Sequence, residues 1–175
     1  MTPEDAGPAA VPSYTHVVTN MAGRLGRIAY VTRQDTAALS TEVPLDIAAV
    51  QEAWPAFELG FDSLHGRRMM GLIDHRAGTY RLCTERLPRD AENPLGLNET
   101  TIPGGHYLRL RLIGDPPGVY GQIAEAFDEL FEHADHDPTR PLIEFYRREG
   151  EVDCLVPVNA PVLSSENSLG TKATQ

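Results

Sequence analysis

The chain has 175 residues, a formal net charge of -10 and a sequence pI near 5.0. This length predicts one domain with a sizeable core, since a chain of this size buries roughly 70% of its unfolded surface. The acidic balance excludes a broad basic face for phosphate backbones, so we expect no direct nucleic-acid binding. No stretch approaches the ~20 apolar residues that span a bilayer, and the acidic N-terminus is not that of a secretory signal. We therefore expect a cytoplasmic protein without membrane association.

The first half of the chain predicts a strand, a helix and a hairpin. Residues 1–13 are acidic and rich in proline and alanine, which is typical of a disordered terminus. Residues 27–33 show the two-residue period of a strand, while residues 14–21 are compatible with either a further strand or an extended lead-in. The next segment, rich in threonine, serine and alanine, predicts a loop up to residue 44.

Residues 45–64 predict an amphipathic helix, because large apolar side chains recur at three- and four-residue spacing. These side chains are Ile47, Val50, Trp54, Phe57 and Phe61. Pro55 lacks a backbone donor and therefore predicts a kink or a break in this helix. Residues 69–74 and 79–87 then predict a hairpin, with Gly78 as the permissive residue of its turn.

The second half repeats this order after a predicted connector at residues 88–101. Residues 105–112 predict a strand with leucines on the face toward a helix, and residues 119–134 predict that helix. Its apolar stripe is Ile123, Phe127, Leu130 and Phe131. Its acidic residues, Glu129 among them, are expected to face water. Residues 142–158 predict the final hairpin, and residues 159–175 predict a disordered tail.

The chain also matches itself weakly when it is shifted by 73 positions. Glu52-Ala53-Trp54 then aligns with Glu125-Ala126-Phe127, and Leu72 aligns with Phe145. The match predicts two pseudo-symmetric strand-helix-strand-strand units, residues 26–87 and 102–158, within one domain over residues 14–158. The expected fold class is α+β, with both units sharing an antiparallel sheet around a central ligand groove.

Four segments resemble the GyrI-like small-molecule-binding domain, which is also the effector-binding domain of some AraC-type and MerR-type regulators. They are Ile102-Pro-Gly-Gly-His-Tyr107, Val119-Tyr120 with Glu125-Ala-Phe-Asp-Glu-Leu-Phe131, Glu144-Phe-Tyr146, and Leu155-Val-Pro-Val158. The resemblance covers about residues 26–158 and depends on the order and spacing of these segments. It implies two strand-helix-strand-strand units packed about a pseudo-twofold axis.

The resemblance further implies binding of bulky, aromatic and often cationic compounds in an aromatic-lined groove, with Glu144 matching the glutamate at its floor. Some similar members hydrolyse strained cyclopropane-bearing genotoxins, and others protect gyrase from toxic agents. Only about 25 residues precede the first unit, too few for a helix-turn-helix, so we expect no transcription factor. Arg109 and Arg111, which we expect on the groove face, depart from the family's pattern. Two positive charges there argue against a preference for cationic ligands.

Strand parity selects the side chains that would line the groove. Glu144 and Tyr146 alternate with two apolar neighbours, so they share the open face if those neighbours face the helices. If the leucines of residues 105–112 face the helices, Tyr107 shares that open face, and the repeat register adds Tyr30. The 73-residue shift places Met69, Gly71 and Ile73 on the partner wall, with Gly71 opposite Glu144. The full candidate ligand-binding set is Glu144, Tyr146, Tyr107, Tyr120, Trp54, Tyr30, Met69, Gly71, Ile73 and Arg109.

A carboxylate among aromatic rings recognises a delocalised cation by charge, while the rings stack on its flat body. Burial would raise the pKa of Glu144, as suits a general acid or base, whereas a nearby Arg109 would lower it. Each residue also has a purely structural interpretation. Glu144 could be an exposed strand acid or a partner of Arg109, Trp54 could belong to the core, and Tyr120 could staple a helix start.

We therefore predict a stand-alone binding protein for bulky hydrophobic or aromatic small molecules, cationic ones included. The alternatives are a hydrolase of electrophilic cyclopropane-type genotoxins, with Glu144 as the catalytic residue, and a module that protects gyrase by protein interaction. A regulator or gyrase would be the protein partner. We expect no cofactor and no metal, because the histidines and aspartates of residues 133–137 lack zinc-site spacing. Cys83 and Cys154 are expected to be buried free thiols.

Overall fold

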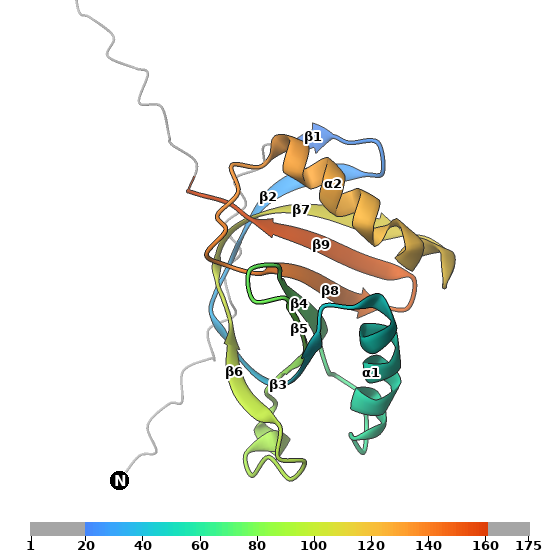
Figure 1. Cartoon of the computed structure of the whole chain (residues 1–175), viewed down its shortest axis with the longest axis vertical. Helices are drawn as coiled ribbons and strands as arrows, with labels where there is room; N and C mark the ends of the chain where they lie inside the picture. Colours follow the sequence, from blue (N-terminus) through green and yellow to red (C-terminus); the bar gives the residue numbers. More distant parts are fainter. Residues whose placement is uncertain (1–19, 161–175) are drawn as a thin grey trace, which may run out of the picture.

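The computed structural model describes residues 20–160, which form a nine-stranded antiparallel sheet with two α-helices, an α+β fold (Figure 1). The strands are β1 (Asn20–Ala22), β2 (Arg27–Arg33), β3 (Thr36–Pro44), β4 (Met69–Asp74), β5 (Thr79–Glu85), β6 (Asn98–Ile102), β7 (Gly105–Ile113), β8 (Leu142–Arg148) and β9 (Glu151–Pro157). The helices are α1 (Ile47–Leu59) and α2 (Ile123–His133), with 3-10 helices η1 (Pro88–Asp90) and η2 (Gly118–Gln122). The expectations for residues 1–13, for residues 14–19 of the possible additional strand, and for residues 161–175 lie outside the described residues.

The order of strands across the sheet is β1-β2-β7-β9-β8-β4-β5-β3-β6. Outward from the centre it therefore runs β8, β9, β7 on one side and β4, β5, β3 on the other. β2 leads into β3 after a two-residue bend, and β6 leads into β7 in the same way. Nevertheless β2 pairs with β7, and β6 pairs with β3. Each bent pair of strands thus belongs to both sides of the sheet.

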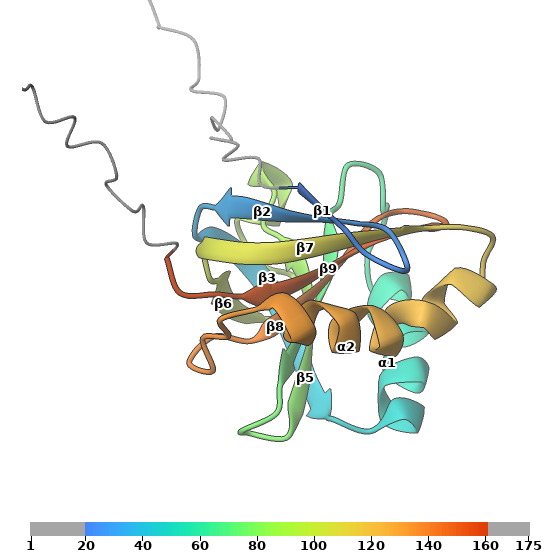
Figure 2. The ribbon, with the colours of Figure 1, turned by 90° about the horizontal axis from the view of Figure 1, so that it is seen from above.

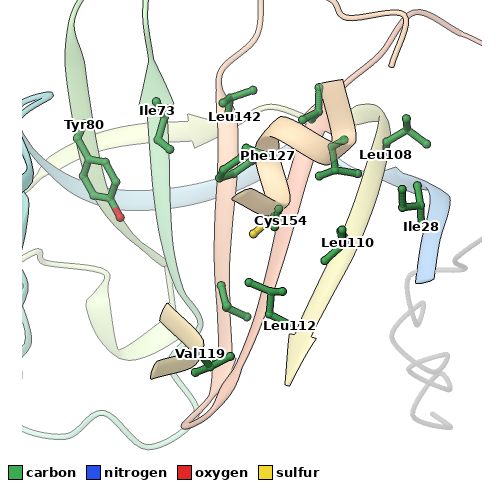
Figure 3. Packing of buried hydrophobic residues seen from close by; sticks show 14 of the residues in the cluster. Ile28, Ile73, Tyr80, Leu108, Leu110, Leu112, Val119, Phe127, Leu142 and Cys154 are labelled. Atoms are coloured by element: carbon green, nitrogen blue, oxygen red, sulfur yellow. The ribbon is translucent and has the colours of Figure 1, made fainter. Parts of the chain in front are cut away.

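Both helices cover the same face of the sheet, as the view from above shows (Figure 2). α2 packs on β7 and β9, and α1 packs on β3 and β5, so the central strands β8 and β4 lie between them. Phe127 of α2 and leucines of β7 such as Leu110 belong to one apolar core (Figure 3). Phe57 of α1 is part of the same core. Burial of such side chains is worth about 1.5–3 kcal/mol each and holds both helices to the sheet.

A smaller apolar cluster lies on the opposite face of the sheet. Its buried members are Ala38, Met70, Leu72, Cys83, Ile102, Tyr107, Ile143 and Leu155. With apolar side chains on both faces, β9 is buried at every position from Glu151 to Pro157. A strand that is buried on both faces loses the alternation that marks a half-exposed strand.

Most of the predicted elements are confirmed. The strand at residues 27–33, both hairpins and both helices are present. The loop predicted up to residue 44 is wrong, because residues 36–44 form β3, which pairs with β5 and β6. Three consecutive buried residues, Ala38, Leu39 and Ser40, hide its alternation. The connector predicted at 88–101 likewise contains most of β6.

The predicted break at Pro55 is wrong, since α1 runs without interruption from Ile47 to Leu59. Pro55 lies on the exposed side of the helix, and Asp46 caps the first turn by accepting the Ala49 backbone N–H at 3.0 Å. Ile47, assigned to the apolar stripe, is 77% exposed and does not join the core.

Glu129 corrects another expectation, since the pattern of α2 placed it toward water. Its carboxylate is 1% exposed and accepts the backbone N–H groups of Arg24 and Leu25 in the turn between β1 and β2. Phe131, assigned to the buried stripe, is 38% exposed. α2 is therefore rotated about its axis relative to the predicted orientation, and Glu129 holds the β1–β2 turn at the edge of the sheet by hydrogen bonds.

Cys83 and Cys154 are both buried and free, as predicted. They lie on opposite faces of the sheet, because Cys83 belongs to the smaller cluster and Cys154 to the core under the helices. Among the helices of residues 20–160, none has the length and apolar character required to cross a bilayer.

Candidate functional site

A buried carboxylate lies at the centre of the sheet, on the face that carries the helices. Glu144 of β8 is 8% exposed, and its Oε2 accepts the hydroxyl of Tyr80 at 2.7 Å and that of Tyr146 at 2.8 Å. Trp54 of α1 donates its Nε1–H to the Tyr80 hydroxyl at 3.1 Å. Within residues 20–160, no donor reaches the second oxygen, Oε1, and no arginine, lysine or histidine forms an ion pair with Glu144.

Aromatic rings surround this carboxylate and contact one another edge to face. The Trp54 ring lies 5.3 Å from that of Tyr146 and 6.3 Å from that of Tyr80, between centroids. Tyr120 of η2 lies 5.9 Å from Tyr146, and its hydroxyl accepts the backbone N–H of Gly150 at 3.1 Å. Such pairs contribute about 0.5–1.5 kcal/mol each beyond the burial of their area. Trp54, Tyr120 and Tyr146 each remain partly exposed, so the cluster reaches the surface.

Gly71 allows Tyr80 to reach the carboxylate. Tyr80 projects from β5 over β4 (Figure 3), and Gly71 is the residue of β4 that pairs with Glu144, as predicted. A Cβ atom at position 71 would come within 1.9 Å of the Tyr80 hydroxyl oxygen. The space that Gly71 leaves is therefore filled by the protein's own phenol.

Burial raises the pKa of Glu144, and the hydrogen bonds from Tyr80 and Tyr146 oppose that shift. Burial also raises the pKa of both phenols, and the adjacent carboxylate adds to the effect, so both hydroxyls stay protonated and donate. Cys154 pairs with Glu144 across the β8–β9 ladder, and burial raises the pKa of its thiol. The site therefore holds one acid and two permanent donors in a region poor in water.

The structure brings together seven of the residues predicted for the site. Glu144, Tyr146, Trp54, Tyr120, Met69, Gly71 and Ile73 all lie on or beside the central strands, on the helix face. Met69 pairs with Tyr146 and Ile73 pairs with Leu142, so these two side chains lie on either side of the Gly71–Glu144 pair. The alternative interpretation of Glu144 as an exposed acid is wrong.

The structure separates the other three predicted residues from Glu144. Tyr107 and Arg109 lie on the opposite face of the sheet, where Tyr107 is fully buried and donates its hydroxyl to the Pro103 carbonyl at 2.6 Å. Tyr30 shares the helix face, but β2 is three strands away from β8. The expected open face with arginines beside Glu144 is therefore wrong, and so is the pairing of Glu144 with Arg109.

The physical reason is a misassigned strand face. Ile28 and Tyr30 pair directly with Leu110 and Leu108 in the β2–β7 ladder, and paired residues point to the same side. On β8, Ile143 faces away from the helices although it is fully buried. Because both faces of β8 are covered, the alternation of apolar residues did not identify the helix side.

Tyr80 is the functional residue that the sequence reasoning missed. Its signal was present: an aromatic residue diagonal to a glycine on the next strand often covers the gap which that glycine leaves. Two surface pockets of the described residues lie elsewhere, one beside His75 and His136 and one between Arg67 and Leu95. Glu144 does not line either of them.

No family model and no curated protein matches the chain. Its fold is similar to that of solved structures. One is SAV2435 bound to tetraphenylphosphonium, with a TM-score of 0.53 and 12% identity over 75% of this chain and 93% of that one. Another is an integron cassette protein from Vibrio cholerae, with a TM-score of 0.58 and 12% identity over 83% of this chain and 97% of that one. At such identity the similarity concerns the fold alone.

Proposed function

We propose that the protein binds bulky aromatic cations in a groove over β4 and β8, between α1 and α2, with Glu144 as the charge that selects them. The observation that carries this proposal is a buried carboxylate that has no cationic partner among the described residues and is surrounded by aromatic rings. A buried charge of this kind costs several kcal/mol unless it is paired. A ligand cation would supply the missing partner.

The arrangement favours a delocalised cation over a compact ammonium. Two phenols already donate to Oε2, so Oε1 is the oxygen left for a ligand. A compact ammonium is strongly hydrated, and the aromatic rings around Glu144 cannot replace all of that water with hydrogen bonds. Aromatic rings do attract a diffuse positive charge, by about 0.5–2 kcal/mol per ring.

Entry of a bulky ligand requires the rings to move, because they fill the groove in this conformation. Trp54 is the side chain we expect to swing out. It is partly exposed, its helix packs mainly on β3 and β5, and its indole forms one hydrogen bond, to Tyr80. Rotamer changes of this kind are common at binding sites.

Two comparisons support the proposal. A protein of similar fold is described as bound to tetraphenylphosphonium, which is itself a bulky aromatic cation. The sequence also resembles the GyrI-like family, and we propose membership in it. In support, Gly71 and Glu144 are strand partners and are also equivalent under the 73-residue shift, as expected if a pseudo-twofold axis passes between them.

Titration with tetraphenylphosphonium tests the function directly. Trp54 is the only tryptophan of the chain, so tryptophan fluorescence, excited at a wavelength that tyrosine does not absorb, reports on this groove. We expect a saturable change with a dissociation constant in the micromolar range, on the order of -8 kcal/mol. Triphenylphosphine oxide, similar in shape but uncharged, should bind more weakly. Absence of saturable binding to the cation would overturn the proposal.

Binding of the cation should weaken as the pH falls. The ligand requires the charged carboxylate, and burial raises the pKa of Glu144, so the loss should begin at a higher pH than for an exposed glutamate. The ligand-free protein should respond in the opposite sense. The folded state holds this proton more tightly than the unfolded state, so the contribution of Glu144 to stability is greatest at low pH and is lost as the pH rises through the folded pKa.

Fluorescence titrations from about pH 4 to pH 8, which spans the range of a shifted glutamate, measure this dependence. Glu144→Gln is the control and should show a flat profile. An affinity for the wild type that does not vary over the range would contradict the role assigned to the carboxylate.

A second function is favoured by the burial of Glu144 beside two phenols, since burial raises the pKa of the carboxyl, as suits a general acid or base. The same groove would then direct water onto an electrophilic cyclopropane. Mass spectrometry would detect the ring-opened hydrated product with the wild type but not with Glu144→Gln. Unchanged compound after prolonged incubation with the wild type would count against hydrolysis and leave binding as the function.

A further inference from the structure

The face of the sheet opposite the helices carries two arginines that lack a counter-ion. Arg33 and Arg109 are both half-buried, and the Nε atom of each is buried without a hydrogen-bond partner among residues 20–160. Neither forms an ion pair with a described carboxylate. A buried donor without an acceptor costs about 1–3 kcal/mol, more for a charged group.

The carboxylates of this face are already engaged by other arginines. Asp153 accepts a bidentate pair from Arg111 at 2.6 and 3.0 Å. Glu151 accepts Arg147 at 3.1 Å and Arg148 at 2.6 Å. Arg111, Arg147 and Arg148 thus share two carboxylates, and Arg33 and Arg109 add two positive charges to this face, although the whole chain carries a net charge of -10.

Phe145 connects the arginines into one cluster. The guanidinium carbon of Arg33 lies 5.5 Å from the centroid of the Phe145 ring, and that of Arg147 lies 5.7 Å from it. Arg109 pairs with Leu155 of β9, on the same face. Burial lowers the pKa of Arg109, the charge of Asp153 opposes that shift, and repulsion from Arg111 and Arg147 adds to it, so Arg109 lies near both of these positive charges as well as near Asp153.

We propose that the arginines around Phe145 bind an organic oxyanion, a carboxylate or a phosphate attached to an apolar body. Arg109 is the principal anchor, because its guanidinium fork matches the geometry of such anions and no described side chain occupies it. Arg33 supplies a second donor, and the partly exposed Phe145 supplies an apolar contact for the body. This site lies on the other face of the sheet from Glu144 and does not depend on the proposed cation groove.

Arginine Nε–H resonances of the full chain provide the test. Benzoate, phenyl phosphate and inorganic phosphate are titrated separately in an anion-poor buffer. We expect saturable shifts of Arg109 and Arg33 with at least one of the two aromatic anions, and weaker binding of inorganic phosphate. The preferred aromatic anion identifies the oxyanion as carboxylate or phosphate. Absence of saturable shifts with all three probes would overturn the proposal.

Arg109→Gln should weaken binding of the preferred anion by about tenfold or more, the loss expected for a charged hydrogen bond of about 1.4 kcal/mol. Arg76→Gln, which removes the same charge from an exposed hairpin turn, should leave it unchanged. Arg109→Lys keeps the positive charge but lacks the planar guanidinium group. It replaces Arg109→Gln in this experiment if the glutamine variant does not fold, and it should also bind the anion more weakly than the wild type. If the Arg76 and Arg109 variants lost the same affinity for the anion, net charge alone would explain the effect and the proposed site would be refuted.

Discussion

Replacing Glu144 with glutamine should lower the affinity for tetraphenylphosphonium about 30-fold or more, because removal of one partner of a buried charge pair costs about 2 kcal/mol at the least. Glutamine has the same shape and keeps an oxygen that can accept the hydroxyls of Tyr80 and Tyr146. The substitution therefore removes the charge and leaves the aromatic frame in place. Trp54 fluorescence measures the loss.

Glu149→Gln is the matched control for this experiment. Glu149 lies in the turn that follows β8 and is exposed, so its removal changes the net charge equally without altering the aromatic cluster around Glu144. The two variants should differ clearly in affinity. Should Glu144→Gln bind as tightly as the wild type, the cation would be held by the rings alone.

The ligand-free Glu144→Gln protein should be at least as stable as the wild type near neutral pH. Burial disfavours the charged carboxylate, and glutamine cannot carry that charge. A variant that loses affinity while retaining stability would separate the role of the charge in binding from any role in folding. Urea denaturation of both proteins gives this comparison.

Replacing Gly71 with alanine should destabilise the fold by up to about 3 kcal/mol, the range found for overpacked cores. The new Cβ would lie 1.9 Å from the oxygen and 2.4 Å from the Cζ of Tyr80. Tyr80 is 2% exposed and is held by hydrogen bonds to Trp54 and Glu144, so it cannot move without breaking them. Urea denaturation monitored by Trp54 fluorescence measures the effect.

Two further variants isolate the cause. Gly118→Ala should be nearly neutral, because a Cβ at that position would meet no atom within 4 Å. Tyr80→Ala should cost much less in the Gly71→Ala background than in the wild type, since the clash disappears with the ring. Additive losses in this double-mutant cycle would show that Gly71 serves some purpose other than making room for Tyr80.

Local sequence patterns were enough to predict the hairpins and the order of the central elements. Residues 69–74 and 79–85 are short runs rich in apolar residues, and a glycine marks the turn between them. The shift of 73 residues also predicted the pairing of Gly71 with Glu144. These features depend on neighbours in the chain or on a repeat that can be read directly.

Long-range pairing was what the sequence could not supply. β3 and β6 pair with each other over a separation of about 60 residues, and neither shows regular alternation. The face of Glu144 depended on whether Ile143 or Leu142 points to the helices, and both are buried. The role of Tyr80 was not predicted, because its hydroxyl reaches Glu144 of β8 from β5, across β4.

The crossing of the bent strands has a consequence for how the protein unfolds. β2 precedes β3 in the chain but is hydrogen-bonded to β7, and β6 precedes β7 but is hydrogen-bonded to β3. Neither the residues before 90 nor those after it can complete their own share of hydrogen bonds in isolation. The two portions are interlocked, so the loss of either one leaves the other with open edges, and we expect a single cooperative transition rather than stepwise melting.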